Sequence, residues 1–151
     1  MTAAIIRPVT PEDLAALAAI EQACFPDPWA VSALGILTAP PYGGLCALLD
    51  GAVVGYVGWM FIPAGDGMAA EAEITRIAVL PAARRCGIGR ALLDAMIARL
   101  RPDGAPLSVY LDVRASNCAA QTLYASCGFV RHGVRPRFYG DEDAFEYSLH
   151  L

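Results

Sequence analysis

Two apolar periods alternate along this chain and predict a fold that mixes helices and strands. Leu14, Leu17 and Ala18 recur at the three-to-four-residue spacing of a helix with one buried face. Short apolar runs that are bounded by Gly, Pro and Asp predict strands. The expected helices are residues 11–25, 29–37, 87–100 and 117–127, and the expected strands are residues 3–7, 45–49, 53–62, 71–79, 108–113, 130–135 and 145–149.

Residues at the ends of these segments support the boundaries. Thr10 and Pro11 suit an N-cap and the first helical position. Asp50-Gly51 suits a hairpin turn, and Gly128 suits the residue after a helix. The order βααβββαβαββ predicts one α/β domain over residues 1–151, with a mixed, mostly antiparallel central sheet and helices on both faces.

Composition narrows the possible classes of function. The net charge of −4, from 11 basic and 15 acidic residues, argues against a nucleic-acid binder with a broad basic face. The longest apolar run, residues 52–62, is too short to cross a bilayer, and charged residues interrupt any N-terminal signal. Five cysteines without a C-x-x-C pair, and two isolated histidines, predict a reducing compartment and no metal site. We therefore expect a cytoplasmic protein that binds neither membrane nor nucleic acid.

The most informative segment is R-R-C-G-I-G-R, which follows an apolar strand and opens a helix. Its glycines let a ligand approach the backbone, and the first N–H groups of the helix attract anions. The same glycines would also suit a simple tight turn with solvated arginines nearby. Our interpretation is a pyrophosphate site, here called the glycine loop, made of Arg84, Arg85, Cys86, Gly87, Ile88, Gly89 and Arg90.

This loop also carries a family resemblance. Residues 84–89 read R-x-x-G-x-G and resemble the acetyl-CoA signature of the GNAT N-acetyltransferases. Residues 111–129 resemble that family's later motif, in the V-R-x-S-N…L-Y-x-x-x-G-F form of the ribosomal-protein alanine N-acetyltransferases, the RimI type. Pro28-Trp29 and Arg137-Phe138-Tyr139 are weaker similarities to the same group. The resemblance runs from Ile6 to the C-terminus and implies a GNAT-like sheet.

The resemblance implies how acetyl-CoA would be bound. In this family two central strands separate, and the pantetheine arm of the cofactor lies between them. The main chain of Ile77, Ala78 and Val79 would then pair with the arm, and Asn117 would bond it further along. Tyr124, two helical turns after Asn117, would protonate the thiolate leaving group. Without a ligand, the three strand residues and Tyr124 would simply be core residues.

The general base is the point at which this chain departs from the family pattern. The family form is L-E-V-R-A-S-N, whereas this sequence has Asp112 in place of the glutamate. Asp112 can still accept a proton through one water molecule, or it can form an ion pair with Arg114 or Arg76. Glu73 is a second candidate, ranked below Asp112, and Glu71 ranks lower still. If its strand is regular, Glu73 shares a face with Ile77, but a bulge would change that face.

The resemblance implies transfer of an acetyl group from acetyl-CoA to a primary amine. The acceptor it favours is the N-terminal amine of a ribosomal protein or similar peptide. A GNAT enzyme that acetylates a small amine is one alternative. A module that binds acyl-CoA without catalysis is another, because Asp112 replaces the expected glutamate.

Overall fold

A single seven-stranded sheet is the centre of the structure. The computed structural model describes residues 3–151. The strands stand in the order β1-β2-β3-β4-β5-β7-β6, and every neighbouring pair is antiparallel except β4 and β5. The strands are β1 (Ile5–Pro8), β2 (Tyr42–Leu49), β3 (Ala52–Ile62), β4 (Ala70–Val79), β5 (Leu107–Arg114), β6 (Val130–Arg135) and β7 (Ala144–His150).

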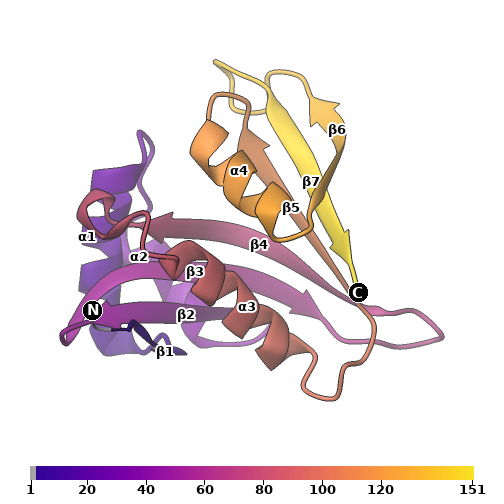
Figure 1. The fold of residues 1–151 in the computed structure, drawn as a ribbon, viewed down its shortest axis with the longest axis horizontal. Coiled ribbons are helices and arrows are strands. Elements are labelled where there is room, and N and C mark those ends of the chain that lie inside the picture. The colour runs from indigo at the N-terminus through magenta and orange to yellow at the C-terminus, as the bar shows by residue number, and fades with distance from the viewer. Residues whose placement is uncertain (1–2) are drawn as a thin grey trace.

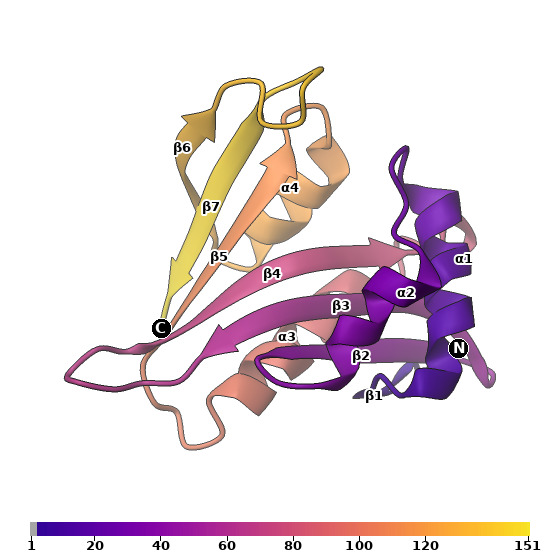
Figure 2. The same cartoon turned by 180° about the vertical axis from the view of Figure 1, so that it is seen from behind.

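Four α-helices cover the two faces of this sheet. They are α1 (Leu14–Cys24), α2 (Val31–Leu34), α3 (Ile88–Leu100) and α4 (Cys118–Ser126). Buried side chains of α3 and α4 pack in one core with β5, and those of α1 and α2 pack in a second core with Tyr56 of β3. The element order and the two covered faces confirm the predicted fold (Figures 1 and 2).

Most element ends differ from the prediction by one to three residues, and two of these differences are described here. The first strand begins at Ile5 rather than at Ala3. The second helix is only one turn of α-helix, Val31–Leu34, followed by the 3₁₀ turn η2 (Gly35–Thr38). Gly35 has a low helix propensity because its backbone loses more entropy on ordering, which is consistent with this early change of helix type.

The parallel neighbours β4 and β5 stay paired over only four residues each. Their register joins Ala70–Glu73 with Leu107–Tyr110. Beyond these residues the two strands diverge, so that β5, β7, β6 and α4 form a wing separate from β1 to β4 (Figures 1 and 2). The opening between the wings is the feature that positions the candidate site.

A bulge in β4 lies at the start of this divergence. Gly58 of β3 is opposite Arg76, and the next residue, Trp59, is opposite Ile74, so Thr75 is the extra residue. An extra residue moves all later side chains to the other face of a strand. Ile74 and Ala78 are four residues apart and would share one face of a regular strand. Because of the bulge, Ile74 lies in the core below α3, whereas Ala78 lies in the core below α1.

Candidate functional site

The glycine loop has the backbone shape of an anion site. Arg85 and Gly87 both have positive φ angles, 63° and 76°, and Gly87 is the N-cap of α3. In the left-handed region glycine avoids the steric cost of a side chain. The helix therefore begins at Ile88, and its first N–H groups face the space in front of the loop.

The three predicted arginines of the loop do not act alike. The Arg84 guanidinium folds back and donates to the carbonyl of Val79 at 3.0 Å and to Cys24 Sγ at 3.6 Å. Arg90 donates to the carbonyl of Ser126 at 3.2 Å, which ties α3 to α4. Arg84 and Arg90 thus brace the loop, and the exposed Arg85 is the better candidate for contact with a phosphate.

The edge of β4 that faces the opening belongs to the predicted cofactor segment. Ile77 and Val79 pair with β3 on one side, opposite Val57 and Gly55. Their pairing with β5 has already ended, at Glu73. A strand edge of this kind presents N–H and C=O groups that β5 does not pair, which suits an extended polar ligand arm, although the Val79 carbonyl already accepts from Arg84.

Tyr124 lies in the core on the side of α3 and α4. Its ring packs against Phe129 and Tyr147, with centroid distances of 5.7 and 6.1 Å. Burial raises the pKa of the Tyr124 phenol above its usual value, so the hydroxyl stays protonated and can act as a proton donor. Asn117 is the N-cap of the same helix, and its Oδ1 accepts from the Ala120 N–H at 3.1 Å.

Asp112 lies on the opposite face, in what we call the acidic pocket, of about 230 Å³. Burial raises the pKa of the Asp112 carboxyl, and the charge of Glu146 adds to this, whereas Arg135 and His132 oppose it. A carboxylate with a raised pKa is a stronger general base. The pocket is lined by Met60, Ile62, Glu71, Ala72, Glu73, Tyr110, Leu111, Asp112, His132, Arg135, Glu146 and Tyr147.

The ion pair predicted for Asp112 involves a different arginine. Its partner is Arg135, with Nε 3.4 Å from Asp112 Oδ1, and not Arg114 or Arg76. Arg135 comes from β6, which is two strands away in the sheet order but lies on the same wing. No sequence pattern indicates this contact, because it depends on how β7 and β6 follow β5.

The bulge also decides the position of Glu73. A regular strand would place Glu73 on the same face as Ile77, but the bulge at Thr75 separates them. Glu73 instead lines the acidic pocket together with Asp112 and Glu71. The structure thus brings together all three predicted base candidates, and of these Glu73 is the most exposed.

A buried charged cluster holds the loop between α1 and α2. Glu21 is fully buried and accepts from Tyr56 Oη at 2.7 Å, from the Trp29 N–H at 2.8 Å and from Arg76 Nη2 at 3.0 Å. The Arg76 guanidinium also lies 3.8 Å from the centre of the Phe25 ring. Arg76 follows the bulge directly, so one side chain connects the opening of the sheet to this loop.

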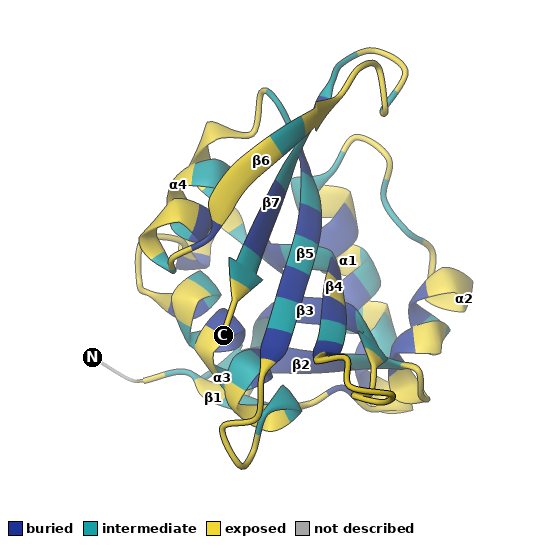
Figure 3. Ribbon diagram, turned by 90° about the vertical axis from the view of Figure 1, so that its right-hand side faces the viewer, coloured by how far each residue is buried: buried dark blue, intermediate teal, exposed yellow. Residues whose placement is uncertain are grey.

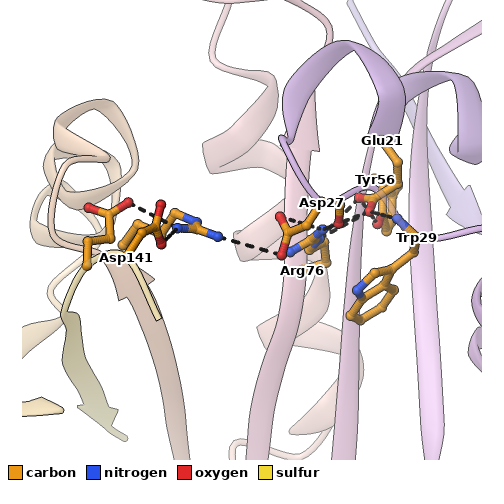
Figure 4. Close-up of polar contacts among 8 residues, drawn as sticks. Glu21, Asp27, Trp29, Tyr56, Arg76 and Asp141 are labelled. Atoms are coloured by element: carbon orange, nitrogen blue, oxygen red, sulfur yellow. Dashed lines mark hydrogen bonds and ion pairs between the residues drawn. The ribbon is translucent and has the colours of Figure 1, made fainter. Parts of the chain in front are cut away.

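A second arginine joins this loop to the one between β6 and β7. Arg114 Nη2 lies 3.6 Å from Asp27 Oδ2, and Arg114 Nη1 lies 3.0 Å from Asp141 Oδ1. Figure 4 shows the contacts running from Asp141 across to Asp27 and on to Glu21. The Arg114 guanidinium also stacks 4.3 Å from the Tyr139 ring centre. Two loops from separate wings are therefore fixed on either side of the opening.

The sequence alone does not predict most of the ion-pair and hydrogen-bond partners described above. The apolar periods mark Glu21 only as a helix residue and Glu146 only as part of the last strand. The alternation of Phe145, Glu146 and Tyr147 does contain a signal, because a charged residue between two apolar ones faces away from their core. That pattern identifies the face of Glu146 but not its neighbour.

Metal ligands and helices long enough to cross a membrane are two further features that bear on function. Over residues 3–151, no group of three or more His, Cys, Asp and Glu side chains is placed to hold a metal ion. The helices in this part of the chain are also too short or too polar to span a membrane.

Comparison with known proteins connects this geometry to a family. The acetyltransferase (GNAT) family model matches residues 14–129. N-alpha-acetyltransferase RimI of Mycobacterium tuberculosis is 37% identical over 124 residues, which are 82% of this chain and 75% of that protein. The ribosomal protein bS18-alanine N-acetyltransferase of Escherichia coli K12 is 43% identical over 83 residues, which are 52% of this chain and 55% of that protein.

Another relative is longer than this chain. An uncharacterised protein of Mycobacterium leprae is 36% identical over 148 residues, which cover 96% of this chain but only 40% of that protein. The chain thus spans between two fifths and three quarters of the length of these three relatives.

Solved structures share the fold over nearly the whole chain. The crystal structure of the ribosomal-protein-S18-alanine N-acetyltransferase from Escherichia coli has a TM-score of 0.86 and 31% identity, covering 99% of this chain and 94% of that one. A plant structure, Arabidopsis thaliana NAA60 with a bisubstrate analogue, has a TM-score of 0.84 at 21% identity, and covers 98% of each chain.

Proposed function

Because this chain belongs to the acetyltransferase (GNAT) family, we propose that it transfers an acetyl group from acetyl-CoA to the N-terminal amine of a peptide. The observation that carries the proposal is the divergence of β4 and β5, which opens beside the glycine loop and the acidic pocket. An acyl donor and a cationic acceptor could therefore meet in the opening from opposite faces of the sheet.

The donor side has the features that acetyl-CoA requires. The start of α3, with Gly87 in a left-handed conformation, suits the pyrophosphate. The edge of β4 at Ile77–Val79 suits the pantetheine arm, whose amides need N–H and C=O partners. Arabidopsis thaliana NAA60, which shares the fold, has also been solved in complex with acetyl-CoA, and we infer the same donor here.

The acceptor side favours a peptide over a small amine. The loops on either side of the opening are held by Asp27, Arg114 and Asp141, and neither loop contributes a residue to the lining of the acidic pocket. Negative charge in that pocket attracts an ammonium group. The Escherichia coli relative is named for the alanine of ribosomal protein bS18, so a ribosomal protein N-terminus is the acceptor we propose. Such a substrate would place the protein in the cytoplasm.

In the proposed chemistry, one residue acts as the general base and another as the general acid. Asp112 removes a proton from the acceptor ammonium, directly or through one water molecule. The free amine then attacks the thioester carbonyl, the C–S bond breaks, and Tyr124 gives its proton to the thiolate. The nitrogen of the new amide loses its second proton, which returns through water to the Tyr124 phenolate, and Asp112 releases its own proton to solvent. Because Tyr124 and Asp112 lie on opposite faces of the sheet, proton removal and proton delivery are separated.

The test is acetyl transfer measured by mass spectrometry. The acceptor is an alanine-starting peptide from the small-subunit ribosomal protein, and its N-terminally blocked copy is the control. Gain of one acetyl group on the free peptide alone would support α-amine transfer. Free amino acids and polyamines are tested as alternative acceptors in the same assay. Faster transfer to a small amine would reject the peptide acceptor, and acetyl-CoA binding without transfer to any amine would reject the activity.

A further inference from the structure

Glu146 lies beside Asp112 in the acidic pocket. The two residues are directly opposite in the register of β5 and β7, so their side chains leave the sheet on the same face. Both are shielded from solvent to a similar extent, with side chains 20% and 26% exposed. Two carboxylates in this position form a cross-strand acidic pair.

A single arginine nitrogen lies between the two carboxylates. Arg135 Nε is 3.4 Å from Asp112 Oδ1 and 3.5 Å from Glu146 Oε2. The Arg135 side chain is 52% exposed and belongs to the edge strand β6, most of which faces solvent (Figure 3). The cation can therefore move into solvent while both carboxylates remain fixed by their strands.

The shape of β6 makes room for the Glu146 carboxylate. The pairing of β6 with β7 shifts between Arg131 and Gly133. A Cβ atom added to Gly133 would lie only 2.9 Å from Glu146 Oε1. The carboxylate thus occupies the space that a larger residue at position 133 would fill, and it is held close to Asp112.

We propose that Glu146 belongs to the acceptor site: with Asp112 it binds the acceptor's ammonium group in the place that Arg135 now occupies. An ammonium carries the same charge as the guanidinium and has three N–H donors, enough for both carboxylates. The inference rests on the proposed acetyl transfer and deepens it, because it assigns a function to a residue that the base and acid roles do not use.

The pair also changes the proton affinity of Asp112. When the acceptor ammonium gives one proton to Asp112, the electrons of the broken N–H bond become the lone pair of the neutral amine, and Glu146 remains the negative partner of a neutral acid. A nearby negative charge favours the protonated form of Asp112, whereas Arg135 favours the ionised form. The other titratable groups that line the pocket are Glu71 and Glu73 of β4, Tyr110 of β5, His132 of β6 and Tyr147 of β7. Tyr139, in the loop after β6, lies close enough to Asp112 for their charges to interact.

The first test needs no turnover. The Asp112 carboxyl is followed by carbon NMR against pH in the wild type and in the variants Glu146→Gln, Arg135→Gln and Arg131→Gln. Because Glu146 raises the Asp112 pKa and Arg135 lowers it, we expect Glu146→Gln to lower that pKa and Arg135→Gln to raise it. Arg131, on the same strand and stacked on Phe145, is the matched control and should change nothing.

The second test measures peptide binding and turnover. We expect Glu146→Gln to raise the Kd and KM for the acceptor peptide about tenfold, which corresponds to a loss of about 1.4 kcal/mol. Arg135→Gln should lower both, because the internal cation no longer competes. Unchanged Asp112 titration and unchanged peptide Kd in Glu146→Gln would overturn the inference even in an active enzyme. By contrast, a wild type that transfers acetyl to no amine would overturn the proposed function, whatever the titration shows.

Discussion

At the scale of single residues, the hydroxyl group of Tyr124 is the proposed general acid. We expect Tyr124→Phe to lower kcat about a hundredfold or more, because general acid catalysis is commonly worth about 10²–10⁴-fold. Acetyl-CoA binding should persist, since the ring still packs against Phe129 and Tyr147. Single-turnover kinetics and calorimetry would separate the two effects. Full turnover in the variant would remove Tyr124 from the mechanism.

Arg76 tests the buried cluster around Glu21. We expect Arg76→Met to lower the free energy of unfolding by about 3 kcal/mol, because removing one partner leaves a buried carboxylate without its cation. Urea unfolding measures this loss. The double variant Glu21→Gln, Arg76→Met is the control: it should recover part of the stability, because no unpaired charge remains. Equal losses in the single and double variants would contradict this account.

Single residues are predictable where a motif fixes their neighbours. Tyr124 and Asn117 belong to one recognisable pattern, and the structure places Asn117 at the N-cap of α4 and Tyr124 on the buried face of the same helix. The partners of Asp112 are not predictable, because Arg135 and Glu146 reach it only through the pairing of β5 with β7 and of β7 with β6. Sequence periodicity indicates the face of a strand but not which strand lies next to it.

At the scale of elements, the contact between β3 and β4 shapes the predicted cofactor edge. Gly55 is buried, and a Cβ atom there would lie 2.9 Å from the carbonyl oxygen of Ala78. We expect Gly55→Ala to cost about 1–3 kcal/mol of stability and to weaken acetyl-CoA binding, because β4 must shift. Thermal unfolding and calorimetry measure the two effects. Gly65→Ala, which meets nothing within 4 Å, should be nearly neutral in both.

The order and kind of the elements are predictable from apolar periods and turn residues, but the bulge in β4 is not. Residues 71–79 form one strand-like run, and nothing in it marks Thr75 as the extra residue. The bulge reverses the faces of the later residues and so moves Glu73 away from Ile77 and into the pocket with Asp112. One unpredicted backbone irregularity therefore decides which carboxylates meet.

At the scale of the whole molecule, the divergence of β4 and β5 is predicted by the family resemblance and not by periodicity. Short parallel pairing, Ala70–Glu73 with Leu107–Tyr110, leaves two wings that α3 and α4 bridge on one face. On the other face the bridge is ionic, through Asp27 and Arg114. We infer that the opening keeps its width because both faces are tied.

Acid stability depends on a site far from the opening, at the start of the chain. Asp13 is buried, accepts from Arg7 Nη1 and Nη2 at 2.7 and 2.8 Å, and accepts from the Thr10 N–H at 2.8 Å. Its hydrogen bonds with Arg7 hold the pKa of the Asp13 carboxyl far below its usual value, although burial opposes this shift. A lowered folded-state pKa contributes stability that is present above the unfolded pKa of about 3.9 and is lost as pH falls below it.

We therefore expect the unfolding free energy of the wild type to fall as pH drops from about 5, at up to about 1.4 kcal/mol per pH unit from this residue. The observed slope should be smaller, because solvent reaches the Arg7 side chain, which is 39% exposed. Asp13→Asn should be less stable at neutral pH and should lose this part of the slope, whereas the exposed Asp103→Asn should keep it. Urea unfolding at a series of pH values gives the comparison. Parallel curves for the wild type and Asp13→Asn would mean that acid unfolding begins at another carboxylate.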